Sequence, residues 1–310
     1  MKNLPLISFP ITIAIVDDDS LMLDSLTELL KNNYALIKFQ EPNKCANFFE
    51  NYKPLSINLK LLQGCNELEN YNISGHLPAD IDFSELAKFR ENKERLNEMG
   101  VLIVDYNMPG MTGIELCRKL QALPIKKILL TGEPSEKLAI SAFNEGIINC
   151  YIRKDSPTIA SDIKGYLESL TKEYLSNITL HLLKHLEADC LLPISDPLFI
   201  NFFINWCSEN NICEYYIIDQ NSTFLLIDKN GKRSYFVTNT DRTLKNLIDM
   251  HEDNNEASAL LTIIKSKKKI PFFGEDKESW DIDIKDWEKY LYVPTILEGR
   301  EKYYWGVLSL

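Results

Sequence analysis

The stretch that most constrains the fold of this chain is residues 101–110, whose sequence is VLIVDYNMPG. Four apolar residues in a row, three of them β-branched, are typical of a short strand buried on both faces of a parallel sheet. The strand ends on Asp105, directly before a turn sequence that contains Pro109 and Gly110. Ligands bind beyond the carboxyl ends of strands in open α/β sheets, so Asp105 is placed to do chemistry. A carboxylate that merely opens the turn is the alternative.

A second apolar run also ends in acidic residues. Residues 11–16, ITIAIV, predict a buried strand and lead directly into three consecutive aspartates at 17–19. Adjacent carboxylates repel one another unless a cation compensates them. The leucine spacing of residues 21–30 predicts an amphipathic helix, and residues 34–39 and 45–52 predict a further strand and helix.

The alternation of strands and helices continues after Asp105. The predicted elements are a helix at 113–120, a strand at 127–130, a helix at 135–144, a strand at 147–152 and a helix at 157–175. Alternating elements joined by short links predict a doubly wound parallel sheet of five strands, a (βα)5 flavodoxin-like architecture of the α/β class. Thr131 and Lys154 then follow the fourth and fifth strands.

The strand ends supply matching chemistry. A cluster of Asp17, Asp18 and Asp105 offers the oxygen ligands that a hard cation such as Mg²⁺ prefers. Such an ion, with the Lys154 ammonium and the Thr131 hydroxyl, would neutralise a phosphoryl group moving to a carboxylate nucleophile. The pattern therefore predicts phosphoryl transfer to an aspartate. Taken singly, Thr131 is better explained as a turn residue, Lys154 as an ordinary surface lysine and Tyr151 as a half-buried strand residue; their joint occurrence at successive strand ends favours the site.

These residues resemble the receiver domain of bacterial two-component response regulators. The matching pieces are IVDDD at 15–19, DYNMPGMTG at 105–113, LLTGE at 129–133 and YIRKD at 151–155. The resemblance implies a cytoplasmic protein that a sensor histidine kinase or a phosphotransfer protein phosphorylates on Asp105. It also implies that Mg²⁺ is the cofactor, held by Asp17, Asp18, Asp105 and the backbone carbonyl of Asn107.

The resemblance further implies a switch. Thr131 is the hydroxyl that moves toward the phosphoryl group, Lys154 is its positive partner, and Tyr151 is the aromatic residue that changes rotamer with them. The sequence departs from the family at Asp155, which stands where a proline is usual, and by an insertion at about residues 54–98.

Residues 161–195 predict a helical linker between two domains. Its apolar residues recur at intervals of four, three and four and predict a helix that could pair with a second copy in a homodimer. This stripe consists of Ile163, Leu167, Leu170 and Tyr174. His181 and His185 have the i, i+4 spacing of metal ligands, with polar positions on a packed helix as the alternative.

The C-terminal part, residues 196–310, has a different pattern. An apolar helix at 198–207 precedes three predicted strands, two helices and two terminal strands, the latter at 290–294 and 302–310. This order predicts an α+β domain with a small antiparallel sheet. Residues 214–237 and the closing YYWGVLSL resemble a PAS-like sensor domain, so we expect a receiver domain at 1–160 and a PAS-like output domain at 196–310.

The composition bears on partners and location. A net charge of -11 argues against nucleic-acid binding, since proteins that track phosphates normally present a basic face. Seven cysteines without CxxC spacing predict reduced, mostly buried thiols in a cytosol. No apolar run approaches the length that spans a bilayer, and the start of the chain lacks the layout of a signal peptide, so we expect no membrane contact.

Two functional hypotheses follow for the whole chain. In the first, phosphorylation of Asp105 switches an output domain that is not an enzyme, binds no DNA and acts through protein or small-ligand contacts. In the second, the receiver domain gates a catalytic C-terminal domain whose constellation is not recognisable in the sequence.

Overall fold

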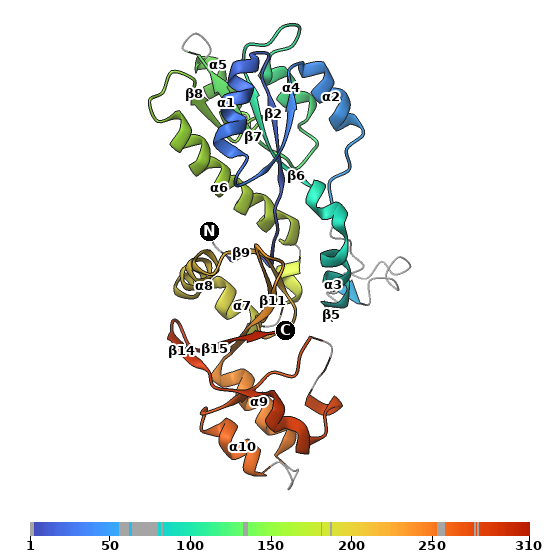
Figure 1. The fold of residues 1–310 in the computed structure, drawn as a ribbon, viewed down its shortest axis with the longest axis vertical. Coiled ribbons are helices and arrows are strands. Elements are labelled where there is room, and N and C mark those ends of the chain that lie inside the picture. The colour runs from blue at the N-terminus through green and yellow to red at the C-terminus, as the bar shows by residue number, and fades with distance from the viewer. Residues whose placement is uncertain are drawn as a thin grey trace. The chain divides into compact units, whose positions relative to one another are not determined.

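The computed structural model describes residues 3–55, 62–63, 80–81, 83–132, 136–180, 182–186, 188–252, 258–275, 277 and 279–310. The chain forms two compact units (Figure 1). The parallel-sheet unit comprises Phe9–Ile57 and Glu91–Ile178, and the antiparallel-sheet unit comprises Met1–Ser8, Asn58–Arg90 and Thr179–Leu310. No helix among the described residues has both the length and the apolar character that crossing a membrane requires.

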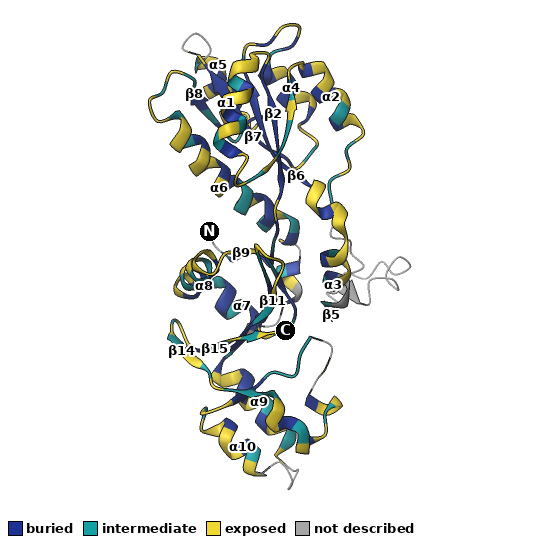
Figure 2. Ribbon diagram, viewed as in Figure 1, coloured by how far each residue is buried: buried dark blue, intermediate teal, exposed yellow. Residues whose placement is uncertain are grey.

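The parallel-sheet unit contains the predicted five-stranded parallel sheet. Its strands, in spatial order, are β3 (Ala35–Phe39), β2 (Thr12–Val16), β6 (Met99–Asp105), β7 (Lys126–Thr131) and β8 (Cys150–Arg153). Every residue of β2 and β6 is buried, as expected for central strands with helices on both faces (Figure 2). The α/β fold expected from the sequence is confirmed.

Helices alternate with these strands, and the last helix follows β8, as the periodicity predicts. They are α1 (Ser20–Leu30), α2 (Pro42–Glu50), α4 (Gly113–Lys119), α5 (Glu136–Asn144) and α6 (Ile159–Thr179). The side chain of Asp19 caps α1 by accepting a hydrogen bond from the backbone N–H of Leu21. Thr112 and Glu115 form a reciprocal capping box that starts α4 directly after the Asp105 turn.

The apolar stripe of α6 has a different role from the predicted one. Ile163, Leu167, Leu170 and Tyr174 are each at most 6% exposed within the single chain. The interpretation of this stripe as a pairing surface for a second copy is therefore wrong, because its side chains are already covered. The possible homodimer stays a prediction without this support.

The antiparallel-sheet unit is built around a six-stranded antiparallel sheet, which the sequence predicts in outline. Its strands, in spatial order, are β1 (Ile7–Ser8), β9 (Ile212–Ile217), β10 (Phe224–Asp228), β11 (Arg233–Asn239), β15 (Lys302–Ser309) and β14 (Thr295–Glu298). The PAS-like resemblance of this part stays a prediction.

Two strands of this sheet are absent from the sequence prediction. Strand β1, from the N-terminus, pairs with β9, and the backbone N–H of Ile217 donates to the carbonyl of Leu6 at 2.8 Å. Strand β14 forms a hairpin with β15. Both are too short to show a periodic pattern, so pairing with distant strands defines them.

The helices of the antiparallel-sheet unit are α7 (Ala188–Ser195), α8 (Pro197–Glu209), α9 (Asp241–His251) and α10 (Ser258–Lys265). Phe199 and Phe203 of α8 pack against Phe236 of β11. A second apolar cluster joins α9 and α10 to the fully buried Trp287.

The segment after α10 differs from the predicted pattern. The predicted strand at 290–294 is shortened to β13 (Leu291–Tyr292), which pairs with β12 (Ile270–Pro271). Two 3-10 helices, Ser279–Asp281 and Ile284–Tyr290, precede it.

The insertion at 54–98 is described only in part. Strands β4 (Leu62–Gln63) and β5 (Asp80–Ile81) pair, and α3 (Phe83–Glu91) is followed by a 3-10 helix, Lys93–Asn97. Residues 56–61, 64–79 and 82 of the insertion lie outside the described residues. Arg90 of α3 forms a 2.7 Å ion pair with Glu275, which ties α3 to the antiparallel-sheet unit.

The cysteines agree with the expectation of buried thiols. Five of the six described cysteines are buried and free, and Cys213 is exposed, while Cys65 lies outside the described residues. Burial raises the pKa of Cys45 and Cys150 to about 12. These thiols therefore remain protonated and unreactive at neutral pH.

Candidate functional site

The strand register brings the predicted site residues to one edge of the parallel sheet. Val16 of β2 lies opposite Val104 of β6, so the residues that follow them, Asp17 and Asp105, are adjacent. Asp105 in turn lies opposite Leu130 of β7, one residue before Thr131. All strands run in the same direction, so their carboxyl ends share this edge.

Three carboxylates converge there as the sequence predicts. Asp17, Asp18 and Asp105 each offer one carboxylate oxygen, and these oxygens lie within 4.8 Å of one another. Asp17 and Asp105 are buried, whereas Asp18 is exposed. Asp17 also accepts a hydrogen bond from the backbone N–H of Asp19 at 3.0 Å, which fixes its orientation.

Lys154 supplies the positive charge. Its Nζ lies 2.9 Å from Asp17 Oδ2 and 2.9 Å from Asp105 Oδ1, so one ammonium bridges two buried carboxylates. The backbone N–H of Lys154 donates to the carbonyl of Thr131 at 2.9 Å, which holds the end of β8 beside β7. Burial disfavours the ammonium, but the hydrogen bonds to Asp105 and Asp17 outweigh this cost and raise the pKa of Lys154.

The charges of this site are unbalanced. Burial raises the pKa of Asp17, and the nearby negative charge of Asp105 adds to the effect, although the hydrogen bond from Lys154 opposes it. Three carboxylates and one ammonium leave an excess of negative charge. The donor set therefore fits a hard divalent cation with oxygen ligands, and Asp17, Asp18 and Asp105 are the side chains that would hold it. The carbonyl of Asn107 stays a predicted fourth ligand.

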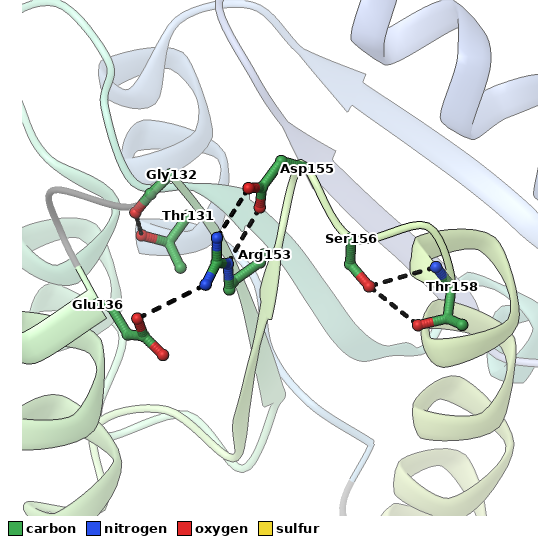
Figure 3. A network of polar contacts seen from close by, with 7 residues as sticks. All are labelled: Thr131, Gly132, Glu136, Arg153, Asp155, Ser156 and Thr158. Carbon is green, nitrogen blue, oxygen red and sulfur yellow. Dashed lines mark hydrogen bonds and ion pairs between the residues drawn. The ribbon is translucent and has the colours of Figure 1, made fainter.

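The two predicted switch residues lie on neighbouring strands. Thr131 is fully buried, and its hydroxyl donates to the carbonyl of Gly132 at 3.1 Å (Figure 3). Tyr151 is half-buried and packs against the apolar core of the parallel-sheet unit. The structure thus places both near the strand ends.

One residue of this region was missed in the sequence. Arg153 forms a bidentate ion pair with Asp155, and Figure 3 shows its guanidinium between Asp155 and Glu136. The i, i+2 spacing of opposite charges in the sequence RKD was the available signal. His181, from the possible metal pair in the linker, lies outside the described residues, as does the side chain of His185.

Proton binding at Asp17 should make the stability of the metal-free fold depend on pH. The folded-state pKa of Asp17 is raised, so its stabilising contribution is fully present below the unfolded-state pKa and is lost as the pH rises through the folded-state pKa. We expect the free energy of unfolding, measured with urea in the presence of EDTA, to fall with rising pH in the wild type. In Asp17→Asn this fall should be absent. Saturating Mg²⁺, at ~100 times its dissociation constant, should restore about 2.7 kcal/mol to the wild type at neutral pH but less to the variant.

A matched variant for this experiment is Asp24→Asn, because Asp24 is 73% exposed on α1 and pairs with Lys38. This variant should keep the pH dependence of the wild type. Identical pH profiles for Asp17→Asn and the wild type would contradict the assignment of the raised pKa.

Comparison with known proteins agrees with this geometry. Residues 79–162 match the response regulator receiver domain family. No curated protein matches the sequence. The solved structure of the response regulator LqsR from Legionella pneumophila is 28% identical, covers 99% of this chain and 89% of its own, and has a TM-score of 0.77. A receiver domain protein from Clostridium thermocellum is 20% identical, covers 55% of this chain and 98% of its own, and has a TM-score of 0.32.

An adenylate cyclase from Rhodopirellula baltica is also similar in structure. It is 22% identical, covers 56% of this chain and 96% of its own, and has a TM-score of 0.38. The family match, the strand order and the full-length likeness to LqsR agree with one another. The parallel-sheet unit therefore has the fold of a response regulator receiver domain, the family that residues 79–162 match.

Proposed function

We propose that Asp105 accepts a phosphoryl group from a partner histidine kinase or phosphotransfer protein in a Mg²⁺-dependent reaction. The observation that carries this proposal is the placement of Asp105: the residue is 6% exposed, and its carboxylate lies beside those of Asp17 and Asp18 and contacts the Lys154 ammonium at 2.9 Å. Burying carboxylates close to one another costs free energy, and such costly clusters are concentrated at functional sites.

In the proposed transfer, Asp105 is the nucleophile and Lys154 stabilises the charge. A carboxylate oxygen of Asp105 attacks phosphorus as the bond from phosphorus to the donor's leaving group breaks, and the leaving group departs with its electron pair. Lys154 contacts Asp105 and stabilises the negative charge that arrives. Mg²⁺, when held by Asp17, Asp18 and Asp105, supplies further neutralisation of the phosphoryl oxygens.

The arrival of the phosphoryl group changes the local charge. It adds about -1.5 to -2 charges beside Asp17 and Asp18, which draws the Lys154 ammonium and the Thr131 hydroxyl toward it. Movement of Thr131 leaves space beside Tyr151 on the neighbouring strand, and a change at Tyr151 alters the surface formed by β8 and α6. This altered surface is the proposed signal.

We assign to the antiparallel-sheet unit an output that acts through protein or small-ligand contacts in the bacterial cytoplasm, without DNA binding and without turnover. The net charge of -11 supports the absence of DNA binding. The competing prediction is a catalytic unit gated by the receiver domain. If that prediction is correct, the full chain with Mg²⁺ and a small phosphodonor should turn over a substrate from a metabolite panel. The Asp105→Asn variant should not.

The direct test uses the full chain with acetyl phosphate and Mg²⁺. Intact mass spectrometry should show the addition of one phosphoryl group, and hydroxylamine should remove it, as expected for an acyl phosphate. Reduction with borohydride followed by peptide mapping should locate the modification at Asp105. Modification at another residue, or none with Mg²⁺ present, would reject the assignment.

A further inference from the structure

The end of strand β8 carries three consecutive charged residues with different partners. Lys154 contacts Asp17 and Asp105, whereas Arg153 and Asp155, on either side of it, contact each other. The Nε of Arg153 donates to Asp155 Oδ1 at 3.0 Å and its Nη2 donates to Oδ2 at 2.8 Å. Both oxygens of Asp155 are therefore engaged by one guanidinium.

A second acidic residue also faces this guanidinium. Glu136, at the start of α5, places Oε2 4.0 Å from Nη1 of Arg153 (Figure 3). Arg153 thus lies between the first turn of α5 and the loop that follows β8. The hydrogen bonds from Arg153 lower the pKa of Asp155 despite an opposing contribution from desolvation, so Asp155 is a carboxylate at neutral pH.

The position of Asp155 creates an electrostatic problem for a phosphoryl-acceptor site. It directly follows the lysine that compensates Asp17 and Asp105, and the site already holds three carboxylates. An unpaired Asp155 would compete for the Lys154 ammonium and would repel an incoming phosphoryl dianion. A planar guanidinium that binds both oxygens neutralises this charge and fixes its direction.

Resting on the proposed function, we propose that Arg153 is a positioning residue: it holds the Asp155 carboxylate away from Lys154, so that the ammonium stays with Asp17 and Asp105. The pair contributes little to stability, since Arg153 is 37% and Asp155 is 58% exposed. Its role is to fix the orientation of the Asp155 carboxylate. Arg153 therefore acts through Asp155 and Lys154 without contacting the reacting atoms.

The test compares the wild type with Arg153→Gln, Asp155→Asn and the double variant as full chains. Acetyl phosphate is varied at fixed Mg²⁺, and the rate of phosphoryl uptake is followed by intact mass. Arg153→Gln should raise the half-saturating concentration of acetyl phosphate about three- to tenfold, as a like charge near a dianion does. Asp155→Asn should match or exceed the wild type. The double variant should return to within about twofold of it.

Mg²⁺ affinity, measured by calorimetry without any phosphodonor, should change in the opposite direction. A released Asp155 carboxylate attracts the cation, so Arg153→Gln should bind Mg²⁺ about three- to tenfold more tightly while it takes up phosphate less readily. A loosened loop would weaken both properties together. The deficit in uptake should also shrink at ~1 M salt, where exposed charges are screened.

Arg118→Gln is the matched control for the loss of one arginine. Arg118 is 53% exposed and forms a 2.8 Å ion pair with Glu145 elsewhere in the parallel-sheet unit. This variant should leave both measurements unchanged. Equal effects of Arg118→Gln and Arg153→Gln would overturn the proposal, because net charge alone would then explain them.

Two further results would also overturn it. One is impairment of Asp155→Asn and of the double variant to the level of Arg153→Gln, which indicates a structural pair. The other is an unchanged half-saturation and an unchanged Mg²⁺ affinity in Arg153→Gln. A wild-type chain that takes up no phosphoryl group rejects the proposed function instead, and the Mg²⁺ affinities of the four proteins still decide the role of Arg153.

Discussion

Asp105→Asn should lower phosphoryl uptake from acetyl phosphate at least about 1000-fold, because an amide lacks the nucleophilic carboxylate oxygen. The substitution preserves the shape of the side chain, and Lys154 keeps its 2.9 Å contact with Asp17. The pocket should therefore remain folded while its reaction is lost. The measurement is the time course of the added mass in full-length protein with saturating Mg²⁺.

The matched control for this prediction is Asp24→Asn on α1, where the carboxylate is 73% exposed and pairs with Lys38. It also replaces a carboxylate by an amide and alters the net charge by the same amount, but it should take up phosphate at the wild-type rate. Uptake by Asp105→Asn at the wild-type rate would show that another residue is the acceptor.

Gly113→Ala should have the largest structural effect near the site. A Cβ at Gly113 would lie 2.2 Å from the carbonyl oxygen of Asp105 and 3.0 Å from its carbonyl carbon. These are backbone atoms, so the start of α4 or the end of β6 must move. We expect a loss of about 2–3 kcal/mol in the free energy of unfolding. We also expect at least about tenfold slower phosphoryl uptake, because Asp105 is displaced.

The matched control is Gly165→Ala within α6, where an added Cβ meets no neighbouring atom within 4 Å. It should stabilise the helix by about 0.5–1 kcal/mol, since alanine loses less backbone entropy on folding than glycine. Urea unfolding followed by circular dichroism measures both variants. Equal stability of the two variants would contradict the clash inferred at Gly113.

Much of the receiver fold was predictable because its signals are local. The apolar runs that precede Asp17 and Asp105 are short strands buried on both faces, and such runs are visible without knowing their neighbours. The family resemblance then assigned expected roles to Thr131 and Lys154. The short strand β1 was not predictable, since its two residues are defined only by pairing with β9, about 200 residues away.

Local patterns also left alternatives that packing resolves. The apolar stripe on α6 has the spacing of a helix that pairs with a second copy, yet Tyr174 and its neighbours are buried within this chain. Tyr174 donates a hydrogen bond to the buried carboxylate of Glu98, which precedes β6. A period of apolar residues shows that a face is covered, but the covering element depends on the tertiary structure.

The sequence by itself determined the parallel sheet and the convergence of acidic residues, because parallel strands carry their carboxyl ends to one edge and the residues that follow them must meet there. Only the tertiary structure decided how the charges are shared: Lys154 bridges Asp17 and Asp105, while Arg153 takes both oxygens of Asp155. The physical reason is that electrostatic pairing depends on distances of a few ångströms, and residues adjacent in the chain can face in different directions at the end of a strand.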